Sequence, residues 1–295
     1  MPLTIRQLPA TNISSLIDKA SVPPNTTFFN PSRAGRYIYI RSTSHSETGE
    51  KNSAIIYDTV TSVAHNIPSP WSLLAPTVNL FQGIEDLRII EYNGYLWFTG
   101  TCTHASDHQI NDLIIGHFSK DLTKVERIGA VDIGSRPVKN VCPFVRNGRL
   151  YILDIFFKKT YEIVDAPEGA PALIAIPATV LVEGGGQSIA GLRGSTSPVH
   201  LHGNIWGVVI HDIIYRNNKT LVTRLSYIHH WMEFDIERAA ITFVSTPFYV
   251  AHWGIEYISG IHLDATNGVV MLYFGVEDKM AFQCATTLTD LRVGY

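Results

Sequence analysis

Charged side chains that could do chemistry gather just before an apolar run in the stretch GIEDLRIIEYNGYLWFTGT, residues 83–101. On a strand, Asp86 and Arg88 share one face and Glu85 lies on the other, because side chains alternate. One interpretation is an ion pair at a strand edge. The other is a reaction site in which Asp86 is a general acid or base. Acting as an acid requires burial or a second carboxylate to raise its pKa.

Two later stretches place basic and hydroxyl-binding residues in similar positions. In KNVCPF (139–144), Lys139 is either a solvated lysine or a partner for phosphate or carboxylate, and Asn140 can bind a hydroxyl through its amide. In RGSTSPV (193–199), Arg193 can bind a phosphate with two donors, and Ser195 and Thr196 can bind hydroxyls. The Gly-Gly-Gly before this stretch is not a phosphate loop, because no GK[ST] follows it.

The second half of the chain adds histidines and one more carboxylate. His211-Asp212 closes a predicted strand, and Tyr227-x-His229 lies on the next one. Contacts to phosphate or sugar are favoured over zinc, because these histidines lack HxH or HExxH spacing. Glu256, in GIEYISGIH, is either an edge charge or a hydroxyl-binding carboxylate or base. Trp253 is the tryptophan best placed to stack on a sugar.

The elements that must position these residues appear as a repeat. Five glycines each precede a short aromatic or β-branched run, at spacings of 59, 54, 55 and 65 residues, and they are Gly35, Gly94, Gly148, Gly203 and Gly268. Asn-Gly between apolar runs predicts a hairpin, since both turn residues need positive φ. The best short helical candidate is ISSLIDKA near the start of the chain. Five β-units of this length favour an all-β fold, a five-bladed β-propeller, over a sandwich with five decorated hairpins.

The repeat also predicts which residues face one another. The position eight residues before each turn glycine holds Thr27, Asp86, Asn140, Ser195 and Gly260. If this position begins the innermost strand of each blade, its residues meet at the mouth of the central channel. The charges before the apolar run would then line a shared pocket instead of entering a core. Gly194 and Gly260 would leave room where another backbone or a ligand comes close.

Composition limits the class of protein. The 295 residues are 45% hydrophobic and 17% charged with a net charge of −3, which is typical of a globular chain and disfavours nucleic acid as a partner. We expect a single domain over residues 1–295, no secretory signal and no membrane span. Cys102, Cys142 and Cys284 are odd in number and far apart, which indicates reduced thiols in a cytoplasmic protein.

The order of the motifs resembles that of a known group of proteins. The series runs EDxR (85–88), KNxxPF (139–144), RGST (193–196), His-acid (211–212), Tyr-x-His (227–229), Ser-x-Pro-Phe (245–248), Ile-Glu-x-x-x-Gly (255–260) and Tyr-Phe-Gly-x-x-Asp (273–278). Over roughly residues 80–285 it resembles five-bladed propeller glycosyltransferase-like domains of bacteria and large viruses. It is more distantly similar to glycoside hydrolase family 130, the mannoside phosphorylases, and to the related β-1,2-mannosyltransferases.

This resemblance implies glycosyl transfer at the channel mouth. In the phosphorylase relatives the aspartate of the EDxR motif is the general acid at the glycosidic oxygen, a role that falls here on Asp86. Basic residues and histidines of those relatives hold the attacking phosphate. The matching positions in this chain are Arg88, Lys139, Arg193, His211 and His229.

The sequence therefore predicts a glycosyltransferase of glycan biosynthesis that moves a sugar from a nucleotide-sugar or sugar-phosphate donor to a carbohydrate acceptor. Asp86 and Glu256 are the catalytic candidates, and no metal or other cofactor is predicted. The predicted substrate-binding residues are Glu85, Arg88, Lys139, Asn140, Arg193, Ser195, Thr196, His211, Asp212, Tyr227 and His229. One alternative is a glycoside hydrolase or phosphorylase that pairs Asp86 with Glu256 or Asp212. Another is a non-catalytic glycan-binding propeller.

Overall fold

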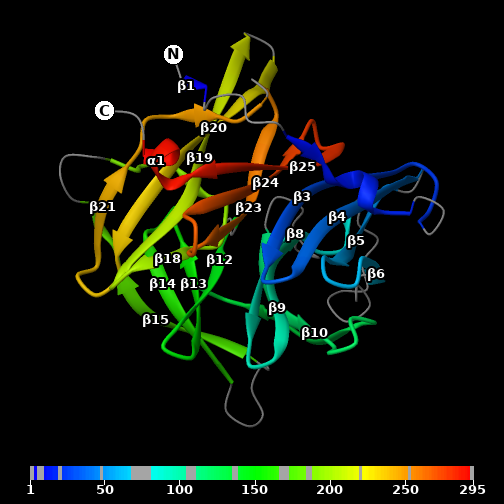
Figure 1. Cartoon of the computed structure of the whole chain (residues 1–295), viewed down its shortest axis with the longest axis horizontal. Helices are drawn as coiled ribbons and strands as arrows, with labels where there is room; N and C mark the ends of the chain where they lie inside the picture. Colours follow the sequence, from blue (N-terminus) through cyan, green and yellow to red (C-terminus); the bar gives the residue numbers. More distant parts are fainter. Residues whose placement is uncertain are drawn as a thin grey trace.

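The computed structural model describes residues 3–4, 10–18, 22–46, 49–67, 81–103, 111–134, 139–165, 173–183, 188–218, 221–251 and 254–292. Almost all regular structure in these residues is β-strand, arranged in five sheets. The sheets are the blades of a β-propeller and stand around a common centre (Figure 1). The predicted fold class, an all-β five-bladed propeller, is confirmed.

The first two blades are simple antiparallel sheets. Blade 1 contains β3 (Thr26–Ala34), β4 (Tyr37–Ser46), β5 (Gly49–Asp58) and β6 (Val63–Ile67), with the short β7 (Phe81–Gln82) parallel to β5. Blade 2 contains β8 (Glu85–Tyr92), β9 (Tyr95–Thr103), β10 (Asn111–Phe118) and β11 (Val125–Val131). In each blade the first strand is the innermost one.

Blade 3 repeats this pattern and blade 4 elaborates it. Blade 3 contains β12 (Cys142–Arg146), β13 (Arg149–Asp154), β14 (Lys159–Asp165) and β15 (Leu173–Val180). Blade 4 contains β17 (Arg193–Gly194), β18 (Val199–His202), β19 (Ile205–Asn218), β20 (Leu221–Asp235) and β21 (Ala240–Val244), joined by β16 (Val182–Glu183), β22 (Phe248–Tyr249) and β1 (Leu3–Thr4). The β19–β20 hairpin is the longest in the described chain and extends beyond the neighbouring blades (Figure 1).

Blade 5 combines a strand from near the start of the described chain with three strands from near its end. It contains β23 (Glu256–Asp264), β24 (Val269–Val276) and β25 (Met280–Thr287), and β2 (Thr11–Asn12) adds its outermost strand. A 3₁₀ helix, η1 (Ile13–Leu16), follows β2, and a short helix, α1 (Leu288–Arg292), follows β25. The predicted helical stretch near the start is thus a single 3₁₀ turn.

The apolar core consists of five clusters, one between each pair of neighbouring blades. Strand β9 shows how one strand serves two clusters. Phe98 packs with blade 1, and Trp97 packs with blade 3. This follows from the two-residue period of a strand, which sends consecutive side chains to opposite faces of a sheet.

The five predicted turn glycines all lie between the first and second long strands of their blades. Their φ angles are +50° at Gly35, +75° at Gly94, +70° at Gly148, +52° at Gly203 and +68° at Gly268. Asn93 and Asn147 also have φ of +50°, as an Asn-Gly hairpin turn requires. The repeat seen in the sequence is therefore the blade repeat of the structure.

None of the helices formed by the described residues combines the length and apolar character needed to cross a membrane. Cys102, Cys142 and Cys284 are buried and free, and burial raises the pKa of each thiol to about 12.

Candidate active site

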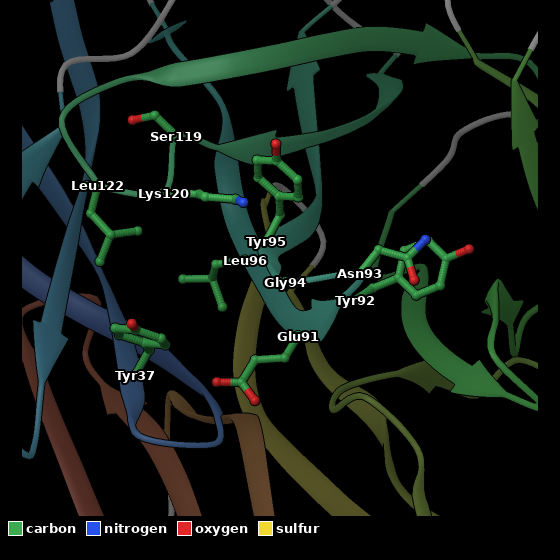
Figure 2. Close-up of a pocket in the computed structure, with 10 residues that line it drawn as sticks. All are labelled: Tyr37, Glu91, Tyr92, Asn93, Gly94, Tyr95, Leu96, Ser119, Lys120 and Leu122. Carbon is green, nitrogen blue, oxygen red and sulfur yellow. The ribbon is translucent and has the colours of Figure 1, made fainter.

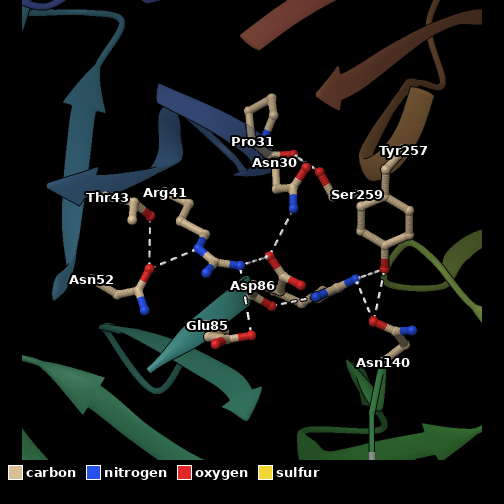
Figure 3. A network of polar contacts seen from close by, with 11 residues as sticks. Asn30, Pro31, Arg41, Thr43, Asn52, Glu85, Asp86, Asn140, Tyr257 and Ser259 are labelled. Carbon is tan, nitrogen blue, oxygen red and sulfur yellow. Dashed lines mark hydrogen bonds and ion pairs between the residues drawn. The ribbon is translucent and has the colours of Figure 1, made fainter. Parts of the chain in front are cut away.

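Three side chains from three blades meet at the centre because their backbones turn in the same unusual way. Asn30, Asp86 and Asn140 have φ of +47°, +52° and +62°. Asn30 and Asp86 each lie at a register shift of the innermost strand, and Asn140 immediately precedes that strand in blade 3. Asn and Asp tolerate this left-handed conformation better than most residues. The kinks bring the three side chains into one polar network (Figure 3).

The carboxylate of Asp86 is held on one side only. Its Oδ1 accepts hydrogen bonds from Asn30 Nδ2 at 2.8 Å and from Arg41 Nη1 at 3.0 Å. Its Oδ2 accepts no hydrogen bond from any residue that the structure describes, and the side chain is 23% exposed. Burial alone would raise the pKa of Asp86, but Arg41 and Arg88 outweigh it and lower that pKa to about 2. Asp86 is therefore ionised at neutral pH.

Arg41, on β4, is the residue that fixes Asp86. Its Nε donates to Asn52 Oδ1 at 2.9 Å, and that oxygen also accepts a hydrogen bond from Thr43. Arg41 Nη1 lies 3.7 Å from Glu85 Oε2, so the guanidinium stands between two carboxylates. The Arg41 side chain is only 9% exposed, and these contacts leave it a single orientation.

Arg88 links four blades and is buried. Its Nε donates to the backbone oxygen of Ser195 at 3.0 Å, and its Nη1 donates to the backbone oxygen of Asp86. Its Nη2 donates to Asn140 Oδ1 at 3.2 Å and to the hydroxyl of Tyr257. Most of its donors are thus used inside the protein. In this arrangement Arg88 positions the site and has little capacity left for a phosphate.

Asn140 presents one half of its amide to the network. Its Oδ1 accepts from Arg88 and from the Tyr257 hydroxyl, which lies 2.8 Å away. The Nδ2 group donates to none of the described residues, and the side chain is partly exposed. This Nδ2 group therefore has no hydrogen-bond acceptor among the described residues, and binding of a ligand hydroxyl there stays a prediction.

Hydroxyl and histidine residues of blade 4 lie next to this network, since Ser195 accepts a hydrogen bond from Arg88 and His211 packs against Tyr257. Ser195 Oγ and His211 Nδ1 share a hydrogen bond of 2.8 Å, and both residues are buried. The His211 ring packs at 5.4 Å from the Tyr227 ring and 5.2 Å from the Tyr257 ring. Thr196 Oγ1 accepts a hydrogen bond from the backbone of β19. Of these four predicted binding residues, Ser195, His211 and Tyr227 contact the network through Arg88 and Tyr257, and Thr196 binds its own blade.

Glu256, the second catalytic candidate, is placed differently from Asp86. It is fully buried, and its two oxygens accept hydrogen bonds from the backbone N–H groups of Val250 and Ala251 at 2.6 and 2.7 Å. Such contacts hold the chain segment before β23 in place. They are the contacts of a structural carboxylate.

The remaining predicted residues lie around the network or outside it. His229 is buried, its Nε2 accepts from the Ile258 N–H at 3.2 Å, and burial lowers its pKa to about 3, so the ring is neutral. Asp212 Oδ1 accepts from the N–H of the next residue along its own strand. Arg193 is half-buried and Lys139 is exposed, and neither forms an ion pair with a described residue. Trp253 lies outside the described residues.

The two glycines predicted to allow close approach do so. A Cβ atom added to Gly194 would lie 2.4 Å from the backbone oxygen of Asn140. One added to Gly260 would lie 2.6 Å from the Cα atom of Ser32. Both contacts are between neighbouring blades, so these glycines allow the inner strands to pack around the centre.

Sequence reasoning missed several residues of the network, among them Asn30, Arg41 and Tyr257. Tyr257 could have been found by alternation, because a strand that turns Glu256 away from the centre turns its neighbour toward it. Arg41 is the charged residue that ends the buried run YIYI, which is a weak signal. Among the described residues, no group of His, Cys, Asp and Glu is arranged to hold a metal ion.

Comparison of the sequence with protein-family models and with curated proteins finds no match. Comparison of the structure does find similar solved structures. A GDP-Man-dependent mannosyltransferase from Leishmania mexicana has a TM-score of 0.58 at 12% identity, covering 93% of this chain and 90% of that one. A β-1,2-mannobiose phosphorylase from Listeria innocua has a TM-score of 0.56 at 11% identity, covering 96% and 97%.

A third structure is a mannose phosphorylase from Leishmania mexicana in complex with a phosphate ion, with a TM-score of 0.56 at 13% identity and coverage of 91% and 86%. The resemblance predicted from the motif order is thus confirmed among solved structures. At these identities the likeness is one of fold. This chain has the propeller fold found in mannoside phosphorylases and in a mannosyltransferase.

Proposed function

We propose that this protein is a carbohydrate-active enzyme, a glycosyltransferase that moves a mannose residue from a phosphate-activated donor to a carbohydrate acceptor. The observation that carries the proposal is the one-sided carboxylate of Asp86. Arg41 and Asn30 fix its Oδ1, while Oδ2 stays available at a partly exposed position. Mannose is the proposed sugar because similar solved structures act on mannosides or transfer mannose.

The ionised state of Asp86 is the state that a general base needs at the start of a transfer reaction. Transfer to an acceptor needs a base, because the acceptor hydroxyl loses its proton as its oxygen attacks the anomeric carbon. In our proposal that proton passes to Asp86 Oδ2. The bond from the anomeric carbon to the donor phosphate breaks, and the electron pair leaves with the phosphate, which needs no proton. A pKa of about 2 suits this role better than that of a proton donor at neutral pH.

The leaving phosphate needs positive charge close to it. Lys139 and Arg193 are proposed for this role, because neither forms an ion pair with a described residue and both adjoin the network. Lys139 is next to Asn140 in the chain, and Arg193 pairs with His211 across the inner strands of blade 4. The free amide of Asn140 is proposed to bind a sugar hydroxyl.

The alternatives have weaker support. Hydrolysis needs a protonated acid at the glycosidic oxygen, which Arg41 and Arg88 disfavour in the free protein. Phosphorolysis is transfer from a sugar 1-phosphate in reverse and would use Asp86 as the acid, so the measured direction of turnover separates it from synthesis. A hydrolase also needs a second carboxylate, and both oxygens of Glu256 are bound to backbone amides. The ion pair of Asp86 with Arg41 is the observation that favours a non-catalytic glycan-binding protein, while the available Oδ2 argues against it.

The test combines donor binding with turnover. Saturation-transfer NMR measures binding of mannose 1-phosphate and of GDP-mannose, and ³¹P NMR follows release of phosphate or GDP with β-1,2-mannobiose as acceptor. The variants are Asp86→Asn and, as a matched control, Asp165→Asn, whose side chain is 76% exposed on blade 3. We expect both variants to bind one of the donors. Asp86→Asn should reduce turnover by a factor of about 100 or more, and Asp165→Asn should leave it unchanged.

Unchanged turnover in Asp86→Asn would remove the catalytic role from this residue. Binding of a free oligosaccharide, with no binding of either donor, would reject the transferase and leave a hydrolase or a glycan-binding protein.

A further inference from the structure

A pocket of about 400 Å³ lies between blades 1 and 2, far from the Asp86 network. It is lined by the β3–β4, β8–β9 and β10–β11 turns, including Tyr37, Glu91, Leu96 and Lys120 (Figure 2). Glu91 is five residues along β8 from Asp86, so the two sites are roughly 17 Å apart at opposite ends of one strand. The volume falls within the range of small-molecule sites and is small for a protein partner.

The pocket combines an apolar floor with a polar rim. Leu96 and Leu122 are buried beneath it, and the ring of Tyr37 stands beside them. Around the opening are a carboxylate, an amide and an ammonium group, from Glu91, Asn93 and Lys120, while the hydroxyl of the buried Ser119 is used within its own turn. A pyranose ring has the complementary shape, since its C–H face is apolar and its hydroxyl edge both donates and accepts hydrogen bonds.

The aromatic side chains of the pocket are fixed before any ligand arrives. The hydroxyl of Tyr37 accepts a hydrogen bond of 2.7 Å from Arg36, whose guanidinium also lies 3.4 Å from Asp58. Lys120 Nζ lies 5.1 Å from the centroid of the Tyr95 ring, in a cation–π contact. A ligand that binds here therefore loses little free energy in ordering these rings.

Glu91 is the group best placed to select the ligand. It is exposed and accepts no hydrogen bond from the described residues, although its charge attracts Arg36. Its carboxylate lies against Gly35, where an added Cβ atom would come within 2.6 Å of Oε1. Any side chain at position 35 would therefore displace the Glu91 carboxylate, and glycine avoids this clash. In the pocket the carboxylate can accept hydrogen bonds from ligand hydroxyls.

We infer that this pocket is a second saccharide-binding site, separate from the Asp86 network. Its occupant is a neutral mannose-containing oligosaccharide, and this choice of sugar rests on the proposed function. The carboxylate of Glu91 disfavours an anionic ligand. Because the two sites lie at opposite ends of the blade, a short oligosaccharide occupies one or the other, and the second site would hold a longer glycan near the enzyme between transfers.

The experiment is a titration of the whole chain with β-1,2-mannotriose, followed by amide NMR. We expect two groups of resonances to shift, one around Asp86 and Asn140 and one around Gly94 and Lys120. Glu91→Gln keeps the side-chain shape and removes the charged acceptor. It should weaken binding at the second group about tenfold and leave the first group unchanged. Lys120→Ala, at an exposed position, should weaken the same group, and Asp86→Asn should leave that group unchanged.

The possible outcomes separate the two proposals. Shifts around Asp86 alone would overturn the second site and leave the proposed function intact. Shifts around Gly94 alone would support the second site and count against the proposed function, and shifts in neither group would overturn both. Binding at Gly94 that neither Glu91→Gln nor Lys120→Ala weakens would also overturn the inference. So would shifts at this pocket caused by a trilysine peptide and not by mannotriose, since the site would then select cations.

Discussion

The substitution Asp86→Asn gives a quantitative test of the central network. Asn has nearly the same shape as Asp, and its Oδ1 can still accept the hydrogen bonds that Asn30 and Arg41 donate. What changes is the negative charge. That charge is favoured in the folded protein because Arg41 and Arg88 overcome the effect of burial. The difference in stability between wild type and variant therefore depends on pH.

The magnitude follows from the pKa. In the folded protein the pKa of Asp86 is about 2, against an ordinary value of 3.8, and one pKa unit corresponds to 1.36 kcal/mol. Ionised Asp86 thus contributes about 2 kcal/mol to the free energy of unfolding at neutral pH. Because the folded pKa is the lower one, this contribution is complete above the unfolded value. It is lost as the pH falls through the folded value, with about half gone by pH 3.

The assay is urea unfolding of wild type and Asp86→Asn at several pH values between 6 and 3. Other carboxylates titrate in both proteins, so the difference between the two isolates Asp86. We expect this difference to shrink by about 1 kcal/mol across the range. The same series on Asp165→Asn, at an exposed position, provides the control. A difference for Asp86→Asn that stays constant from pH 6 to pH 3 would refute the assigned role of the two arginines.

Three further predictions concern the site and its surroundings. Glu256→Gln should lower the free energy of unfolding by about 1–3 kcal/mol in urea denaturation. The reason is that a buried charged acceptor of two backbone N–H groups is replaced by a neutral one. An unchanged stability would contradict the structural role. Gly194→Ala should lower the free energy of unfolding by about 1–3 kcal/mol in the same assay, because the added Cβ would lie 2.4 Å from the backbone oxygen of Asn140. An unchanged free energy of unfolding would show that the inner strands can move apart easily. With GDP-mannose as donor, kcat/KM for transfer should stay level as the pH is lowered from 7 to 4, because Asp86 stays ionised and can still act as the base. A marked fall in the initial rate before the pH reaches 5 would mean that another group is the base.

The fold could be predicted because its turns repeat. Each blade turn has a residue with positive φ, a conformation that favours glycine, so glycines recur along the sequence at similar spacings. The site could be predicted where the innermost strands enter in the same register. Counting back eight residues from the turn finds Asp86, Asn140 and Ser195, and Arg88 contacts all three.

The same count fails in blades 1 and 5. The innermost strands of blades 1, 2 and 5 each carry a register shift, but at different distances from the turn glycine: between Phe29 and Ser32, between Glu85 and Arg88, and between Ile258 and Gly260. As a result Asn30 and Tyr257, not Thr27 and Gly260, supply the polar groups of those blades. The position of a β-bulge within a strand is hard to predict from residue types alone.

The partners of charged side chains were the other part that sequence could not supply. Arg41 lies on β4, the second strand of blade 1. The count back from each turn glycine covers only the innermost strands, so it cannot find Arg41. Glu256 and His229 both looked like ligand-binding groups by type. In the structure both accept hydrogen bonds from backbone N–H groups. Every residue except proline has such a group, so residue types alone do not predict these contacts.

The pairing of β2 with β25 has a consequence for the order of folding. Asn12 lies opposite Phe282 in that pair, at a separation of 270 residues along the chain. During synthesis the β2–β25 pair can form only after β25 has left the ribosome, and the apolar flank of blade 1 gains its other partners from blade 5, such as Tyr273 on β24, only shortly before. Contacts between such distant segments form slowly, because a very long loop must close first. The blades formed from residues between β2 and β25 can therefore assemble as an open arc before the ring closes.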